Sequence, residues 1–171
     1  WIENVKWRLD LRTETRRKHF LKVIPELIDA QNKGLMITER VIGGYMYLRC
    51  LIGPSELPLF FYDHPDVIHD CMKTWFELAN AIIEMHQQYT VIDELFFGED
   101  ICYNHGPLIS PQMIKEFLFP YYQQLITNIK SRQAKSGRHL YFHLDTDGYA
   151  VSVIPLYKEL GMDVMSPFEV A

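Results

Sequence analysis

The sequence predicts an α/β fold, most simply a (β/α)8 barrel of the TIM type, of which these 171 residues would cover roughly half to two-thirds. Short apolar runs bounded by turn residues alternate with segments whose apolar residues recur at helical spacing. Strands separated by helices require parallel pairing and right-handed crossovers, which leaves a doubly wound sheet or a barrel. No strand is followed by a glycine-rich nucleotide-binding pattern, and this favours the barrel.

Composition places residues 1–171 in one globular domain, with 48% apolar and 23% charged residues. The net charge of −5 comes without a basic run, so nucleic acid is not an expected partner. No apolar stretch approaches the ~18 residues that span a bilayer. The charged start also lacks a signal-peptide core, so we expect a cytoplasmic protein with no membrane partner. Cys50, Cys71 and Cys102 have no metal-binding spacing and are expected to be reduced thiols.

The first elements follow from apolar spacing. Residues 1–34 are charged and helical in period. Two apolar runs, Leu35–Ile37 and Val41–Ile42, are expected to be strand. The clearest helix runs from Pro65 to about Gln88, because proline is favoured at the first helical position and apolar residues then recur every three to four positions.

The strand-then-helix pattern continues to the last residues. Val91–Ile92 and Leu95–Phe97 are typical of a buried parallel strand. Ser110 is expected to cap the next helix, and Pro120 to kink it. The remaining elements expected are a strand at His139–Phe142, a helix at Val151–Leu160 ended by Gly161, and a strand at Asp163–Met165. Four strands are fewer than a barrel of about 250 residues contains, so we expect the barrel's beginning and end to be missing.

Reactive side chains in parallel α/β folds collect at the carboxyl ends of the strands. Neighbouring carboxylates beside a histidine would acquire different pKa values, one suited to an acid and another to a base. The expected catalytic residues are Glu99, Asp100, His143 and Asp145, and the expected substrate-binding residues are Tyr103, Asp147 and Glu169. The same region could hold a divalent metal such as zinc, manganese or iron, with His143, Asp145 and Glu169 as ligands.

Each candidate also has a structural alternative. Glu99 and Asp100 would be a solvated loop pair, and His143 a satisfied core histidine, since it directly follows an apolar run. Asp147 would cap the next helix from a turn, and Asp145 would brace that loop.

Several short segments of the sequence together indicate a family. They are GEDICYNHGPLISP from Gly98, FPYY from Phe119, HLDTDG from His143 and SPFE from Ser166, with YDHPD from Tyr62 ahead of the long helix. In this order and spacing, over about residues 35–171, the chain resembles the uroporphyrinogen decarboxylase superfamily. That superfamily includes the haem-pathway decarboxylase, a lyase, and the cobalamin-dependent methyltransferases. The resemblance implies a (β/α)8 barrel with a pocket for a tetrapyrrole or corrinoid at the strand ends, around which the candidate residues would lie.

Two differences set the chain apart from the members it resembles. The arginine-rich loop with which the decarboxylase binds substrate carboxylates has no counterpart in these residues. The His-x-Cys zinc pair of the methyltransferases corresponds to His143-Leu144-Asp145, in which a carboxylate replaces the thiolate and makes a site better suited to oxygen substrates or water. The resemblance therefore implies a divergent member.

Three functional hypotheses follow. The first is an enzyme acting on a tetrapyrrole-type or small carboxylated or methylated substrate, with corrinoid-dependent methyl transfer as the alternative reaction. The second is a non-catalytic domain that binds a corrinoid or a protein partner. The third is a structural fragment, whose exposed strand edges would pair between copies to give a homo-oligomer.

Overall fold

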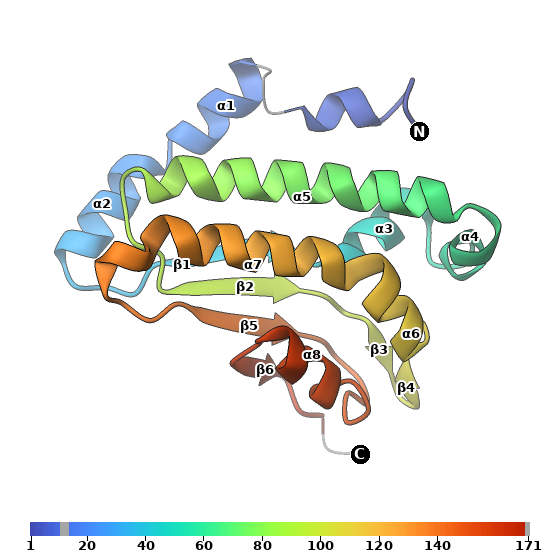
Figure 1. Cartoon of the computed structure of the whole chain (residues 1–171). Coiled ribbons are helices and arrows are strands. Elements are labelled where there is room, and N and C mark those ends of the chain that lie inside the picture. The colour runs from blue at the N-terminus through green and yellow to red at the C-terminus, as the bar shows by residue number, and fades with distance from the viewer. Residues whose placement is uncertain (11–13, 170–171) are drawn as a thin grey trace.

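A four-stranded parallel sheet forms the centre of the computed structural model, which describes residues 1–10 and 14–169 (Figure 1). Its strands are β1 (Thr38–Ile42), β2 (Glu94–Gly98), β5 (Tyr141–Asp145) and β6 (Val164–Ser166). They lie side by side in the order in which the chain forms them. The two-residue strands β3 (Cys102–Tyr103) and β4 (Gly106–Pro107) form a separate antiparallel hairpin. The expected α/β class is confirmed.

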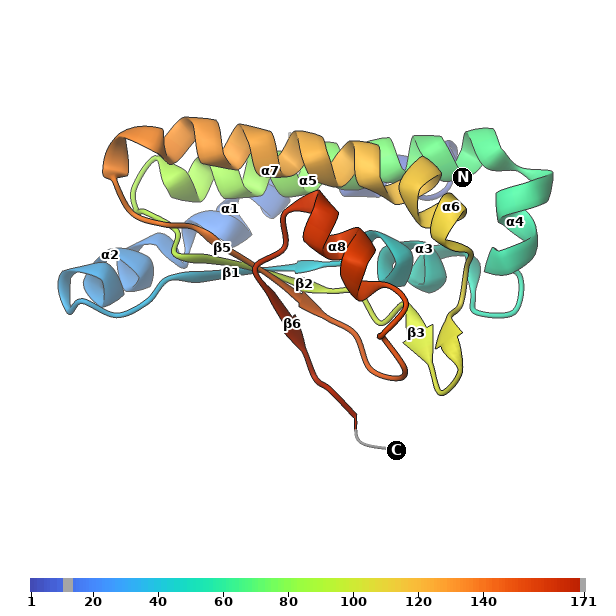
Figure 2. The ribbon, with the colours of Figure 1, turned by 60° about the horizontal axis from the view of Figure 1, so that its bottom comes forward.

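Helices make every connection between neighbouring strands of the main sheet. The connection from β1 to β2 contains α3 (Gly44–Ile52), α4 (Leu57–Asp63) and α5 (Pro65–Gln87). That from β2 to β5 contains α6 (Pro111–Met113), the π-helical turn Ile114–Leu118, α7 (Phe119–Gln133) and the 3-10 turn Ala134–Ser136, and α8 (Ile154–Leu160) precedes β6. Figure 2 shows α5, α7 and α8 on the same face of the sheet.

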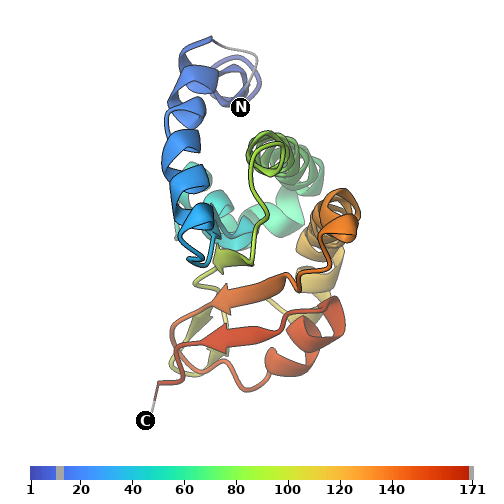
Figure 3. The same ribbon diagram turned by 90° about the vertical axis from the view of Figure 1, so that its left-hand side faces the viewer.

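The N-terminal helices form an arm beside α5. They are the 3-10 turn η1 (Lys6–Leu9), α1 (Glu14–Leu21) and α2 (Ile24–Asn32), and the arm lies on the side of α5 opposite α7 (Figure 3). None of the helices formed by residues 1–10 and 14–169 combines the length and the apolarity needed to cross a membrane.

Side-chain alternation gives the sheet two different faces. Leu95, Phe97, Phe142 and Leu144 are completely buried beneath the helices. The opposite face carries the alternate residues and is here called the open face. Its members are Thr38, Arg40, Ile42, Glu94, Phe96, Gly98, Tyr141, His143, Asp145, Val164 and Ser166. Several of them are exposed, Tyr141 to 46% of its surface.

The long helix and one cap agree with their sequence signals. α5 runs from Pro65 to Gln87, within one residue of the expected end. The Ser110 hydroxyl accepts a hydrogen bond from the Met113 N–H at 3.2 Å, as a capping serine should. The irregularity expected near Pro120 is the π-helical turn just before it, since proline provides no N–H for the preceding turn. Gly161 ends α8 in the left-handed conformation, with φ of 100°.

Strand boundaries differ from those expected. β5 is displaced toward the C-terminus and ends at Asp145, so His143 lies within a strand rather than after one. Leu35 and Met36 lie outside β1 and are more than half exposed. Strand pairing sets both boundaries. β1 begins after Ile37, because the Ile37 carbonyl accepts the first hydrogen bonds from the segment that leads into β2. β5 extends to Asp145, because β2 and β6 both pair with it as far as that residue. The short helix α4 was not predicted from the sequence.

Candidate functional site

The carboxyl ends of all four strands meet along one edge of the sheet. The register aligns Ile42 with Gly98, Gly98 with Asp145, and Asp145 with Ser166. Beyond β2, the N–H groups of Glu99 and Asp100 both donate to the Asp145 carbonyl, at 2.8 and 3.2 Å. The backbones of Glu99, Asp100 and Asp145 therefore meet at the carboxyl edge of the sheet.

Glu99 is completely buried and anchors the start of α3. Its Oε1 accepts the Tyr45 N–H at 3.0 Å, its Oε2 accepts the Tyr122 hydroxyl, and that hydroxyl accepts the Gly44 N–H at 2.5 Å. Gly43 must be glycine because an added Cβ would lie 2.1 Å from Oε2 of Glu99. Burial raises the pKa of this carboxyl to about 7, although the hydrogen bonds from Tyr122 and the backbone act to lower it.

Asp100 forms an ion pair with a residue of α3, the helix that Glu99 anchors. Its Oδ2 lies 2.7 Å from Nη1 of Arg49, near the end of α3, and both side chains are about one-third exposed. A backbone φ of 44° at Asp100 places it in the left-handed region. Glu99 and Asp100 thus hold the two ends of α3. The interpretation as a solvated loop carboxylate is wrong for Glu99, which is completely buried, whereas Asp100 is partly exposed and ion-paired.

One buried threonine joins the loops that follow β2 and β5. The Thr146 hydroxyl accepts hydrogen bonds from the N–H groups of Ile101 and Cys102, at 3.0 and 3.2 Å. Its own N–H donates to the Ser166 carbonyl at 2.8 Å, which adds the end of β6. The three loops therefore form one connected rim at the carboxyl edge.

The three residues expected to bind substrate lie on this rim. The Tyr103 carbonyl accepts the Tyr149 N–H at 2.8 Å, and a Glu169 carboxylate oxygen accepts the Gly148 N–H at 2.9 Å. The Tyr103 and Glu169 side chains are exposed, as is Asp147. Asp147 does not cap α8, which begins seven residues later at Ile154.

His143 lies in a hydrogen-bonded line that crosses the open face. Its Nδ1 is 2.9 Å from Oε1 of Glu94, and its Nε2 is 2.6 Å from the Ser166 hydroxyl. The other oxygen of Glu94 accepts the Thr38 hydroxyl at 2.8 Å. Each of the four strands contributes one member, and both His143 and Glu94 keep 17% of their side-chain surface exposed. This histidine is hydrogen-bonded, but it does not belong to the apolar core.

The line includes residues that the sequence did not single out, namely Thr38, Glu94 and Ser166. Glu94 precedes its apolar run, whereas the rule for parallel sheets points to residues that follow a strand. The alternation of side chains along β2 would have identified Glu94, because Glu94, Phe96 and Gly98 lie on one face of the sheet and the buried Leu95 and Phe97 lie on the other.

The expected metal ligands are not brought together. Within the described part of the chain, no group of three or more His, Cys, Asp or Glu side chains is arranged to hold a metal ion. Both ring nitrogens of His143 already have partners, and Glu169 contacts the Gly148 N–H on the rim. The cysteines are free thiols, with Cys71 and Cys102 buried.

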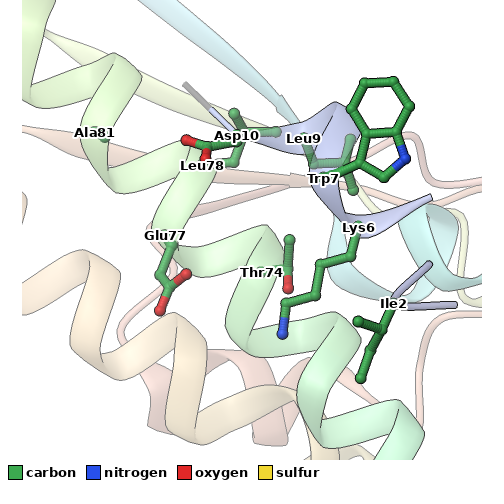
Figure 4. Close-up of a pocket in the computed structure, with 9 residues that line it drawn as sticks. All are labelled: Ile2, Lys6, Trp7, Leu9, Asp10, Thr74, Glu77, Leu78 and Ala81. Carbon is green, nitrogen blue, oxygen red and sulfur yellow. The ribbon is translucent and has the colours of Figure 1, made fainter. Parts of the chain in front are cut away.

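Two cavities lie away from this line. One of about 580 Å³ is formed between η1 and α5, and Figure 4 shows Lys6 and Thr74 among its lining residues. A smaller one of about 320 Å³ lies between Tyr62 near the end of α4 and the segment from Pro107 to Met113. Neither includes a residue that was expected to carry chemistry.

No known protein-family model matches this chain, and no curated protein matches it. Its function is therefore inferred from the side chains at the carboxyl edge and on the open face.

Proposed function

We propose that this chain belongs to a (β/α)8-barrel enzyme of the uroporphyrinogen decarboxylase superfamily. In this proposal His143 transfers a proton to a tetrapyrrole-type or small carboxylated substrate at the carboxyl ends of the strands. The observation that carries the proposal is the line from Glu94 through His143 to Ser166, on the face of the sheet opposite α5, α7 and α8 (Figure 2).

Topology supports the barrel. The four strands are adjacent in chain order, and the helices α5, α7 and α8 that connect them lie on one face (Figure 2). A doubly wound sheet reverses its strand order and carries helices on both faces. In a closed barrel the open face would be the interior, and Ser166, at the end of β6, would lie at the catalytic end.

The geometry at His143 suits a proton donor. Decarboxylation breaks the bond to the departing carboxyl group, releases CO2 and leaves the electron pair on carbon, which must then take a proton. A protonated His143 gives that proton from Nε2, directly or through the Ser166 hydroxyl at 2.6 Å. Glu94 at Nδ1 fixes the orientation of the ring.

The carboxylates of the edge take different roles in this proposal. Asp145 shares the open face with His143 and is level with Ser166 in the register, so it is the acidic group available to orient a substrate. Glu99 and Asp100 hold α3 in place and are positioning residues. The donor set at His143 does not fit zinc, because both ring nitrogens are engaged and, in the part of the chain that the structure describes, no three His, Cys, Asp or Glu side chains are arranged to hold a metal, so no step is assigned to one.

The test is turnover by the full protein. Uroporphyrinogen and a small aromatic carboxylate would be assayed for CO2 release, with His143→Gln and Glu94→Gln as variants. His143→Gln should lose about a hundredfold or more of the rate, the usual contribution of a general acid. The matched control is His139→Gln, because His139 is 60% exposed just before the same strand. Wild-type rates in His143→Gln, or no turnover of either substrate class by the wild-type protein, would contradict the proposal.

A further inference from the structure

We propose that Arg40 binds the carboxylate of the substrate, which then lies over Phe96 with its reacting carbon toward His143. The inference rests on the proposed function for the direction of the chemistry. The binding itself stands on the arrangement of the open face.

Arg40, Phe96 and His143 form one row across three strands. The register pairs Arg40 with Phe96 and Phe96 with His143. The guanidinium of Arg40 lies 4.7 Å from the centre of the Phe96 ring, and that ring meets the His143 imidazole edge-on at 4.8 Å between centres. Two strand spacings separate the Cα atoms of Arg40 and His143 by about 10 Å, and the Phe96 ring lies between the two polar groups, so a ligand that contacts both would lie across this ring.

The Arg40 guanidinium has unused hydrogen-bonding capacity. Its side chain is exposed, and among residues 1–10 and 14–169 it has the Phe96 ring as a partner but no ion pair. By contrast, Arg49 and Arg138 each contact a carboxylate, on Asp100 and Asp93. A guanidinium stacked on an aromatic ring keeps the N–H groups of its edge available, in the planar fork that matches a carboxylate.

The acidic groups of the same face set the orientation of the ligand. Both oxygens of Glu94 are engaged, one by Thr38 and the other by His143. Asp145 lies at the carboxyl edge, on the strand of His143. A ligand carboxylate is repelled from these two groups and attracted to Arg40. Its uncharged part is therefore directed over Phe96 toward the His143 ring.

Benzoate is a suitable probe, with benzamide as its uncharged match. Both would be titrated into the full protein, and binding would be followed by the NMR signals of the His143 ring. Benzoate should shift these signals saturably and benzamide should not. Arg40→Gln should weaken benzoate binding about tenfold or more, the worth of one charge-assisted contact. Arg40→Lys should recover part of the loss, because it keeps the charge without the planar fork.

The matched control is Arg17→Gln, since Arg17 is exposed on α1 and belongs to neither site. Benzoate binding that Arg40→Gln leaves unchanged, or the absence of a saturable shift in the wild-type protein, overturns the inference. The two proposals also fail differently. Binding through Arg40 without turnover supports this inference and removes the proposed function. Turnover whose KM is unchanged in Arg40→Gln retains the proposed function and removes this inference.

Discussion

Replacing Glu99 with glutamine should change how the stability of the fold depends on pH. An exposed glutamate ionises near 4.5, whereas burial raises the pKa of Glu99 to about 7 in the folded protein. Between these values the folded state holds a proton that the unfolded state has lost. The free energy of unfolding therefore falls as pH rises through this interval, and the loss is complete above the folded pKa.

The magnitude follows from the two pKa values. Each pH unit between 4.5 and about 7 lowers the free energy of unfolding by about 1.4 kcal/mol, so the ionisation of Glu99 lowers it by about 3 kcal/mol by pH 8. That is a large part of the 5 to 15 kcal/mol that is roughly typical of a domain. Glutamine has no proton to lose and keeps an oxygen for the Tyr45 N–H, which Glu99 accepts at 3.0 Å. The variant should therefore gain about 3 kcal/mol relative to wild type between pH 4.5 and 8.

Urea unfolding at half-unit pH steps would measure this difference. Other titrating groups change both proteins equally, so subtraction isolates Glu99. The matched control is Glu159→Gln, because Glu159 is a 67% exposed carboxylate paired with Lys115 and should show little pH-dependent difference. A wild-type minus Glu99→Gln difference that stays constant within about 0.5 kcal/mol across the range would refute the assignment of a protonated, buried Glu99.

Three further substitutions have definite outcomes. Gly43→Ala should destabilise the fold by about 3 kcal/mol in urea unfolding, because its Cβ would lie 2.1 Å from the Glu99 carboxylate; a loss under about 1 kcal/mol would contradict this. His86→Gln should cost more stability at pH 6 than at pH 9. Burial acts to lower the pKa of His86, but the contact with Glu39 outweighs burial and raises that pKa, so the stabilisation from the pair is lost as pH rises through the pKa of the folded state. Equal costs at both pH values would exclude a stabilising His86–Glu39 pair. Gly148→Ala should lower the free energy of unfolding by about 2 kcal/mol, because φ is 84° at this position and an added Cβ would lie 2.8 Å from the β3 backbone. An unchanged urea midpoint would contradict this and show that the rim can rearrange to accept the Cβ.

Local signals in the sequence were sufficient for the long helix and the cap at Ser110, and insufficient for the short helix α4 and for the strand ends. The helix from Pro65 and the cap at Ser110 depend on neighbouring residues, so periodicity and capping chemistry identify them. The end of β5 depends on its neighbours in the sheet. His143 and Asp145 look like loop residues in the sequence, but β2 and β6 pair with them and extend the strand.

The candidate site, too, was predicted only in part. The rule that parallel strands share a carboxyl edge was enough to place Asp100 beside Asp145. It could not show that Glu99 points inward to α3, since burial of a carboxylate requires partners from elsewhere in the chain. Arg40 and Glu94 were missed because their importance comes from cross-strand contacts with Phe96 and His143, which no local pattern reveals.

The alternation of side chains along β5 limits how this strand can change in length. One residue inserted ahead of His143 would turn His143 and Asp145 into the helix-packed layer and expose Leu144, which is now completely buried. Two inserted residues would restore the face but move the imidazole about 7 Å along the strand, away from Glu94 and Ser166. Insertions and deletions should therefore be tolerated far less in β5 than in the loop between Asp147 and α8, where no strand register has to be kept.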